Sequence, residues 1–258
     1  LAAGINGASA WRWNKDRGAV DMTGFIASNG MSSWGQPVAG AYTATGEMAD
    51  ASAAIYYSNS DLVGGPVVIG AFPNGGPGFD QGAGEAYGIS DGGIAVGLAY
   101  DATNNPIAFR WTQADGMTRL TVNRPDTFSR ANGISRDGRV IYGWNDQETG
   151  FRSGVIWIDG EPIDLVDADG NPIGEALAAS ADGRVVVGSG YNTVDGSEAW
   201  RWTQATGAQP IGLLASAPAK PGKRLPMPAK TVRSERADAR FAPTTDGFGF
   251  AEAYAFAV

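Results

Sequence analysis

The sequence repeats itself about every 45 residues, and this period limits the possible folds more than any other feature. Two kinds of landmark recur at intervals of 46 and then 45 residues: the glycines Gly97, Gly143 and Gly188, and the tryptophans Trp111, Trp157 and Trp202. In each unit the glycine precedes the tryptophan by 14 residues. Two landmarks in register indicate one supersecondary unit that is used repeatedly.

Each unit is predicted to contain four short strands. In the clearest copy, Asp182-Gly183 forms a tight hairpin turn, because glycine accepts a positive φ without steric cost. The second strand follows at 185–187, and the third at 199–202 alternates Trp and Arg between its two faces. A second turn leads to a fourth strand at 209–213. The chain shows no sustained 3.6-residue periodicity, so we expect little helix.

Four strands in each unit of 40–45 residues predict an all-β fold, a β-propeller. Hairpins of the third and fourth strands are expected near Trp13, Tyr57, Trp111, Trp157 and Trp202. Hairpins of the first and second strands are expected at 30–43, 86–98, 131–144, 176–191 and 245–258. The N-terminus thus lacks a first half-blade, and the C-terminus has one to spare. We predict five four-stranded blades closed by N- and C-terminal strands, with six blades or a β-sandwich as alternatives.

The 258 residues are predicted to form a single repeat domain, with a basic, proline-rich insert or linker at 218–243 before the closing strands. This insert has seven basic and two acidic residues, a charge of +5. The other residues have 12 basic and 25 acidic side chains, a charge of −13, which sum with the insert to the net −8. We interpret the insert as a linker or strap that lies along the acidic body or binds an acidic partner.

Two missing residue types exclude many kinds of site. Without cysteine the chain has no disulfide, thiol nucleophile or thiolate metal site. Without histidine it has no Ser–His–Asp triad and no usual zinc or copper site. The acidic balance argues against nucleic acid as a partner. No apolar run approaches the roughly 18 residues of a membrane span.

The repeated motifs carry a resemblance to a known family. The units read Gly88-Ile-Ser-Asp-Gly and, further on, Ile107-Ala-Phe-Arg-Trp-Thr112, and a similar pattern covers residues 86–214. This pattern resembles the HAF-type extracellular repeat of bacteria, which is named for a His-Ala-Phe triplet, although the His is replaced here. The resemblance implies an exported, extracellular or bacterial cell-surface protein, and it implies no activity.

Repeated arginines and two irregular tryptophans are the binding candidates. Arg12, Arg110 and Arg201 lie between aromatic residues on predicted strands, where they serve either inter-blade packing or an anionic ligand. Trp34 and Trp144 fall outside the repeat pattern and near loops. They are candidates for exposed platforms that bind sugars or protein.

The acidic residues form two patterns. Asp91, Asp137, Asp182 and Asp246 recur at the hairpin turns, and we interpret them as turn formers because an active site needs one asymmetric set. Asp167, Asp169 and Asn171 alternate along one segment, an arrangement of oxygen ligands that suits calcium. The alternative is an Asp-Gly-Asn-Pro turn that needs no ion.

The leading functional hypothesis is a non-catalytic, secreted or surface-exposed repeat protein that binds a glycan or protein partner or assembles with itself. The first alternative is a carbohydrate-active enzyme of the glycoside hydrolase type, with carboxylates in a propeller channel. Its candidate residues are Glu47, Asp50, Glu85 and Glu198. The second alternative is a structural component of an extracellular fibre or surface layer.

Overall fold

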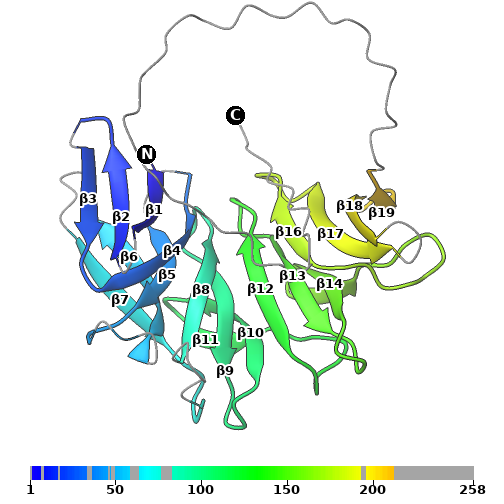
Figure 1. The fold of residues 1–258 in the computed structure, drawn as a ribbon, viewed down its shortest axis with the longest axis horizontal. Coiled ribbons are helices and arrows are strands. Elements are labelled where there is room, and N and C mark those ends of the chain that lie inside the picture. Colours follow the sequence, from blue (N-terminus) through cyan, green and yellow to red (C-terminus); the bar gives the residue numbers. More distant parts are fainter. Residues whose placement is uncertain are drawn as a thin grey trace, which may run out of the picture.

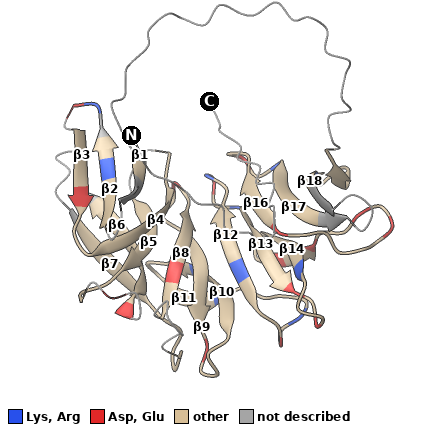
Figure 2. Ribbon diagram, in the orientation of Figure 1, with Lys and Arg blue, Asp and Glu red and all other residues tan. Residues whose placement is uncertain are grey.

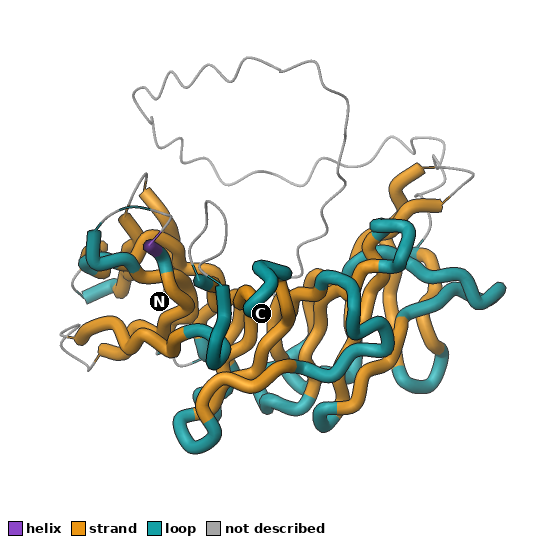
Figure 3. Tube along the Cα trace, turned by 90° about the horizontal axis from the view of Figure 1, so that it is seen from below, coloured by secondary structure: helices purple, strands orange, loops and turns teal. Residues whose placement is uncertain are grey.

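The described part of the chain is built mainly from strands joined by turns and loops (Figure 3). The computed structural model describes residues 2–211 except 7–8, 17, 34–36, 46, 48–49, 59–63, 77–82 and 193–195. In that part of the chain, no helix is long and apolar enough to cross a membrane.

The described strands form five antiparallel sheets in chain order, the first with three strands and the others with four. The first sheet consists of β1 (Ala2–Asn6), β2 (Ser9–Asn14) and β3 (Gly18–Met22). The second consists of β4 (Phe25–Met31), β5 (Val38–Tyr42), β6 (Ser52–Ser58) and β7 (Gly64–Gly70). The third consists of β8 (Gly84–Ile89), β9 (Ala95–Tyr100), β10 (Pro106–Thr112) and β11 (Gly116–Arg119). The fourth consists of β12 (Ser129–Ile134), β13 (Val140–Asp146), β14 (Arg152–Ile158) and β15 (Glu161–Asp164). The fifth consists of β16 (Ala176–Ala179), β17 (Val186–Asn192), β18 (Gly196–Thr203) and β19 (Gly207–Pro210).

The five sheets follow one another around an arc, with the first and fifth at its two ends (Figure 1). Strands β4, β8, β12 and β16 form the inner edges of their sheets and contact the next inner strand along the arc. This radial arrangement of four-stranded meanders is a β-propeller, as the repeat predicted. The alternative of a β-sandwich is wrong, because the sheets succeed one another around the arc instead of stacking as two layers.

The two ends of the chain differ from the middle repeats. The first sheet has three strands, since residues 2–6 pair with residues 9–14. The sequence had predicted only the last two strands of this sheet, so that detail is wrong. The closing strands expected at 245–258 and the basic insert at 218–243 lie outside the described residues, so both stay predictions.

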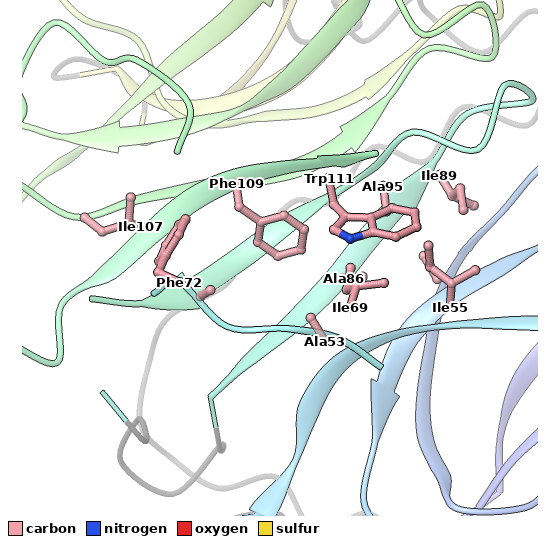
Figure 4. Close-up of a cluster of buried hydrophobic side chains, with 12 residues drawn as sticks. Ala53, Ile55, Ile69, Phe72, Ala86, Ile89, Ala95, Ile107, Phe109 and Trp111 are labelled. Atoms are coloured by element: carbon pink, nitrogen blue, oxygen red, sulfur yellow. The ribbon is translucent and has the colours of Figure 1, made fainter. Parts of the chain in front are cut away.

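The core lies between neighbouring sheets. Phe109 and Trp111 project from β10 toward Ile55 of β6 and toward Ile69 and Phe72 at the end of the second sheet (Figure 4). All five side chains are buried. On β10 the aromatic side chains thus face the preceding sheet, while the alternate residues face the following one. Burial of large apolar side chains between consecutive sheets is the main force that holds the arc together.

The glycine landmark has a packing reason. Each inner strand contains a β-bulge, for example between Ala131 and Gly133, opposite the landmark glycine of the second strand. A Cβ built on Gly143 would stand 2.0 Å from the carbonyl oxygen of Arg130. A Cβ on Gly97 would stand 2.0 Å from the carbonyl oxygen of Glu85. Glycine therefore recurs about every 45 residues because each inner strand has a bulge that leaves no room for a side chain at the opposite position.

Candidate functional site

The three predicted arginines do not converge on one ligand. Arg12 is only 2% exposed in the first sheet, and its terminal nitrogens form no hydrogen bond within the described residues. Burial lowers the pKa of its guanidinium. Arg110 lies 3.8 Å from Asp115 in the turn that follows its own strand. Arg201 is exposed on the fifth sheet. Arg110 therefore forms an ion pair close to its own strand and not the expected one between blades. The three arginines lie on three separate sheets.

Trp144 is not an exposed platform. Its side chain is only 5% exposed on β13, so this part of the prediction is wrong. The guanidinium of Arg152 lies 4.6 Å from its ring centroid, and that of Arg130 lies 5.5 Å from it. The two cations cover the indole, because an aromatic ring attracts positive charge. Trp34 lies outside the described residues.

The candidate calcium segment forms a turn. Oδ1 of Asp167 accepts hydrogen bonds from the backbone N–H groups of Asp169 at 2.9 Å and of Asn171 at 2.8 Å. Hydrogen bonds from Asn171 lower the pKa of Asp167, and the bond from the Asn171 side chain has the largest effect. The described residues contain no group of three or more acidic side chains that could hold a metal ion. The geometry supports the alternative that the sequence left open, a turn in which one Asp caps the backbone.

The repeated Asp residues support the turns, as predicted, in two of the three described copies. Oδ1 of Asp137 accepts from Ser135 Oγ at 2.6 Å and from the N–H of Arg139 at 3.1 Å. Asp182 repeats both contacts with its own repeat's residues, and the hydrogen bond from Ser180 lowers its pKa. Asp91 instead accepts from the N–H of Ser33 at 2.7 Å and thereby links its turn to the preceding sheet.

The inner strands are joined by a repeated contact that we call the inter-strand clamp. The side-chain amide of Asn29 on β4 donates to Glu85 Oε1 at 2.6 Å and to the carbonyl oxygen of Ala86 at 3.1 Å. The side-chain amide of Asn132 on β12 makes the same two kinds of contact two repeats later, across the junction between β12 and β16. It donates to Glu175 Oε2 at 3.4 Å and to the carbonyl oxygen of Ala176 at 2.7 Å.

The junction between β8 and β12 uses other chemistry at the same positions. Tyr87 takes the place of the asparagine, and Arg130 takes the place of the glutamate. The Arg130 guanidinium lies 4.8 Å from the Tyr87 ring centroid. Burial, followed by the nearby charge of Glu85, raises the pKa of Tyr87, which keeps its phenol protonated. Figure 2 shows the acidic position of β8 beside the basic position of β12.

Glu85 belongs to the inter-strand clamp, and hydrogen bonds hold its carboxylate in place. Both of its carboxylate oxygens accept hydrogen bonds, from Asn29 and, at 3.0 Å, from the Tyr87 hydroxyl. Glu175 is held by different partners, ion pairs with Arg152 at 3.1 Å and with Arg130 at 3.6 Å. Because the asparagine contact of Glu85 recurs at Glu175, we interpret Glu85 as a residue that supports the frame, like those of the repeated turns. Of the other enzyme candidates, Asp50 accepts a hydrogen bond from Thr45 at 2.8 Å, and Glu47 is exposed. The side chain of Glu198 is not described.

A cavity of about 520 Å³ lies between the fourth and fifth sheets. We call it the arginine cavity, because three arginines and one aspartate are its charged lining residues: Arg139, Arg184, Arg201 and Asp182. Its apolar lining includes Val140, Ile158 and Trp202. This volume lies within the usual range of ligand pockets.

Sequence reasoning missed most of this cavity. Of its charged residues only Arg201 was a candidate, and strand alternation places the Arg201 side chain on the opposite face of β18 from Trp202. Arg139 and Arg184 immediately follow the Asp-Gly turns of two consecutive repeats. The repeated Gly-Arg-Val at 138–140 and 183–185 was therefore the signal that could have found them.

No protein-family model and no curated protein matches the sequence. Solved structures do resemble it. TolB from Acinetobacter baumannii aligns over 81% of this chain and 51% of its own, with 16% identity and a TM-score of 0.51. A putative TolB from Agrobacterium tumefaciens aligns over 81% and 79%, with 17% identity and a TM-score of 0.53. Puromycin hydrolase aligns over 80% and 32%, with 16% identity and a TM-score of 0.52.

The chain thus spans about half of the Acinetobacter TolB and about a third of puromycin hydrolase. At these identities the likeness shows the fold, a β-propeller, and leaves the function to be argued from the site.

Proposed function

We propose that this chain is a non-catalytic binding protein that takes a glycan in the arginine cavity. The observation that carries the proposal is the cavity itself, about 520 Å³ with the partly exposed Ile158 and Val185 in its wall and arginines in its lining. Apolar side chains and planar hydrogen-bonding groups are suited to the apolar faces and hydroxyl edges of sugar rings. Composition and the resemblance to the HAF-type repeat support a location outside the cell or on a bacterial surface.

The clamp favours binding over catalysis. In a glycoside hydrolase two carboxyl groups act on the same glycosidic bond, and their environments differ. One of them is kept protonated so that it can donate its proton to the leaving group. Glu85 and Glu175 instead occupy equivalent places in the repeat, and each accepts hydrogen bonds on both oxygens. Such carboxylates fix the positions of the inner strands.

The test is a glycan array with the intact chain, run with and without Ca²⁺, followed by hydrolysis assays on common polysaccharides. We expect binding that does not depend on Ca²⁺ and no release of reducing ends. The variant Gln204→Ala, at an exposed position of the cavity lining, should weaken binding, while Trp13→Leu, on the first sheet, should not. Absence of binding on the array, or turnover of a polysaccharide, would overturn the proposal.

The second candidate function is association with a protein or with another copy of the chain. The observation in its favour is apolar exposure at both ends of the arc, 40% for Trp13 and 56% for Ile211. Trp13 lies on β2 of the first sheet, and Ile211 directly follows β19 of the fifth. Light scattering over a hundredfold range of concentration tests self-association. A constant monomer mass would leave only a different protein as the partner.

A further inference from the structure

We infer that the arginine cavity selects a carboxylated sugar unit, a uronate, through the side chains of Arg139 and Arg184. This inference rests on the proposed function and specifies its ligand. The chain as a whole is acidic, with 27 acidic and 19 basic residues, yet Arg139 and Arg184 line this cavity beside one aspartate, Asp182. A basic cavity on an acidic protein concentrates an anionic ligand there.

The two arginines are available for a ligand at little cost. Arg139 lies 3.6 Å from Asp159, and Arg184 lies 3.4 Å from Asp182. All four side chains are more than half exposed, so each pair contributes little to stability. Because these contacts are weak, a ligand carboxylate that accepts two hydrogen bonds from a guanidinium can replace or add to them.

The repeat places these two guanidinium groups at one cavity. Each arginine is the first residue after an Asp-Gly turn, one on the fourth sheet and one on the fifth. Gly183 packs against Val140, where a Cβ would stand 2.5 Å from Cγ2, so the two turns approach closely. In the third sheet the first residue after Asp91-Gly92 is Gly93, so this turn has no arginine at the equivalent position.

The remaining lining favours a sugar over an acidic peptide. Asp182 would repel further carboxylates, whereas it can accept a hydrogen bond from a hydroxyl. Gln204 adds an amide donor and acceptor, and Ile158 and Val185 add partly exposed apolar surface. One carboxylate beside several hydroxyls and an apolar ring face describes a uronate residue.

Isothermal titration calorimetry of the intact chain with trigalacturonate tests the inference. The matched probes are galactotriose, a neutral sugar of the same size, and hexaglutamate, an acidic peptide. We expect trigalacturonate to bind about tenfold or more tightly than galactotriose, since a hydrogen bond between charged groups has that effect. Arg139→Gln and Arg184→Gln should each remove most of this preference. Arg110→Gln, which removes the same charge on the third sheet, should leave it unchanged.

Three results would overturn the inference, and they separate its failure from that of the proposed function. Equal affinity for the neutral and the acidic sugar, unaffected by either arginine variant, would reject the uronate and keep a glycan site. Hexaglutamate that binds as tightly as trigalacturonate would reject the sugar in favour of a peptide. Absence of binding to both sugars, together with an empty glycan array, would reject both proposals. Arg139 and Arg184 are exposed, so their variants are expected to fold, and tryptophan fluorescence checks this.

Discussion

The same repeat positions are buried in the middle of the arc and exposed at its ends. Trp157, on the fourth sheet, is fully buried, whereas Trp13 at the equivalent place in the first sheet is 40% exposed. Leu120, after the last strand of the third sheet, is 6% exposed, whereas Ile211 at the equivalent place in the fifth sheet is 56% exposed. The sequence treats these positions alike, and among the described residues only the presence of a neighbouring sheet differs.

This difference shows what a repeat unit can and cannot do alone. The Trp face of each sheet is made to pack on the preceding sheet, and the opposite face on the following one. A middle sheet satisfies both faces with its neighbours, so most of the hydrophobic stabilisation belongs to the junctions and not to the sheets. Each end sheet of the described arc keeps one face of this kind uncovered.

The comparison is tested most strongly by removing tryptophans. Trp157→Ala should cost about 3–5 kcal/mol, because a fully buried indole leaves a cavity and the hydrogen bond from its Nε1 to the Thr121 carbonyl oxygen is lost. Trp13→Ala should cost well under half of that, since much of the ring already contacts water. Urea denaturation followed by circular dichroism measures both. Equal costs would mean that another part of the chain or a second copy covers Trp13.

The bulge opposite the landmark glycine gives the next largest effect. Gly143→Ala should cost about 1–3 kcal/mol, because its Cβ would collide with the Arg130 carbonyl oxygen and force the inner strand to move. Gly65→Ala is the control, since a Cβ there meets nothing within 4 Å. Thermal denaturation of the two variants gives the comparison. A tolerant Gly143 would show that the bulge does not explain the 45-residue spacing.

The inter-strand clamp should have a smaller effect. Asn132→Ala removes donors to Glu175 and to the Ala176 carbonyl oxygen, and we expect a loss of about 1–2 kcal/mol. Asn29→Ala should cost a similar amount at the junction between the second and third sheets. Tyr87→Phe, which keeps the ring beneath Arg130, should cost less than either. If both asparagine variants unfold at the wild-type urea concentration, the clamp is not a stabilising device.

The smallest expected effect depends on pH. Burial raises the pKa of Asp146 at the end of β13, so the folded state binds its proton more tightly than the unfolded state does. Its ionised form therefore opposes folding at neutral pH, and stability from this group returns as the pH falls toward the raised pKa. Asp146→Asn should raise the Tm by about 1 °C at pH 7, with a gain that vanishes in acid. A gain that is the same at pH 4 and pH 7 would contradict the proposed origin.

Much of the architecture could be predicted because the repeat is defined by motifs of residues that are close together in the sequence. Asp-Gly turns, alternating Trp and Arg, and regularly spaced glycines placed most of the strands of the second to fifth sheets close to their observed positions. The same local signals misjudged the first sheet, where residues 2–6 form a strand without a clear copy of the motif. They also failed at Trp144, because burial beneath Arg130 and Arg152 depends on residues 8–14 positions away.

By itself the sequence determined that this protein is a radial array of antiparallel sheets, because each unit's turns and strand alternation are fixed by neighbouring residues. The tertiary structure decided which side chains meet across sheets. Asn132 reaches Glu175 over 43 residues of chain, and Arg139 and Arg184 border one cavity over 45. Such pairings arise only when two sheets pack, since the pleat fixes the face of a side chain and not its partner. The 45-residue period thus predicts the arrangement of the sheets, and the junctions between the sheets determine what the protein can bind.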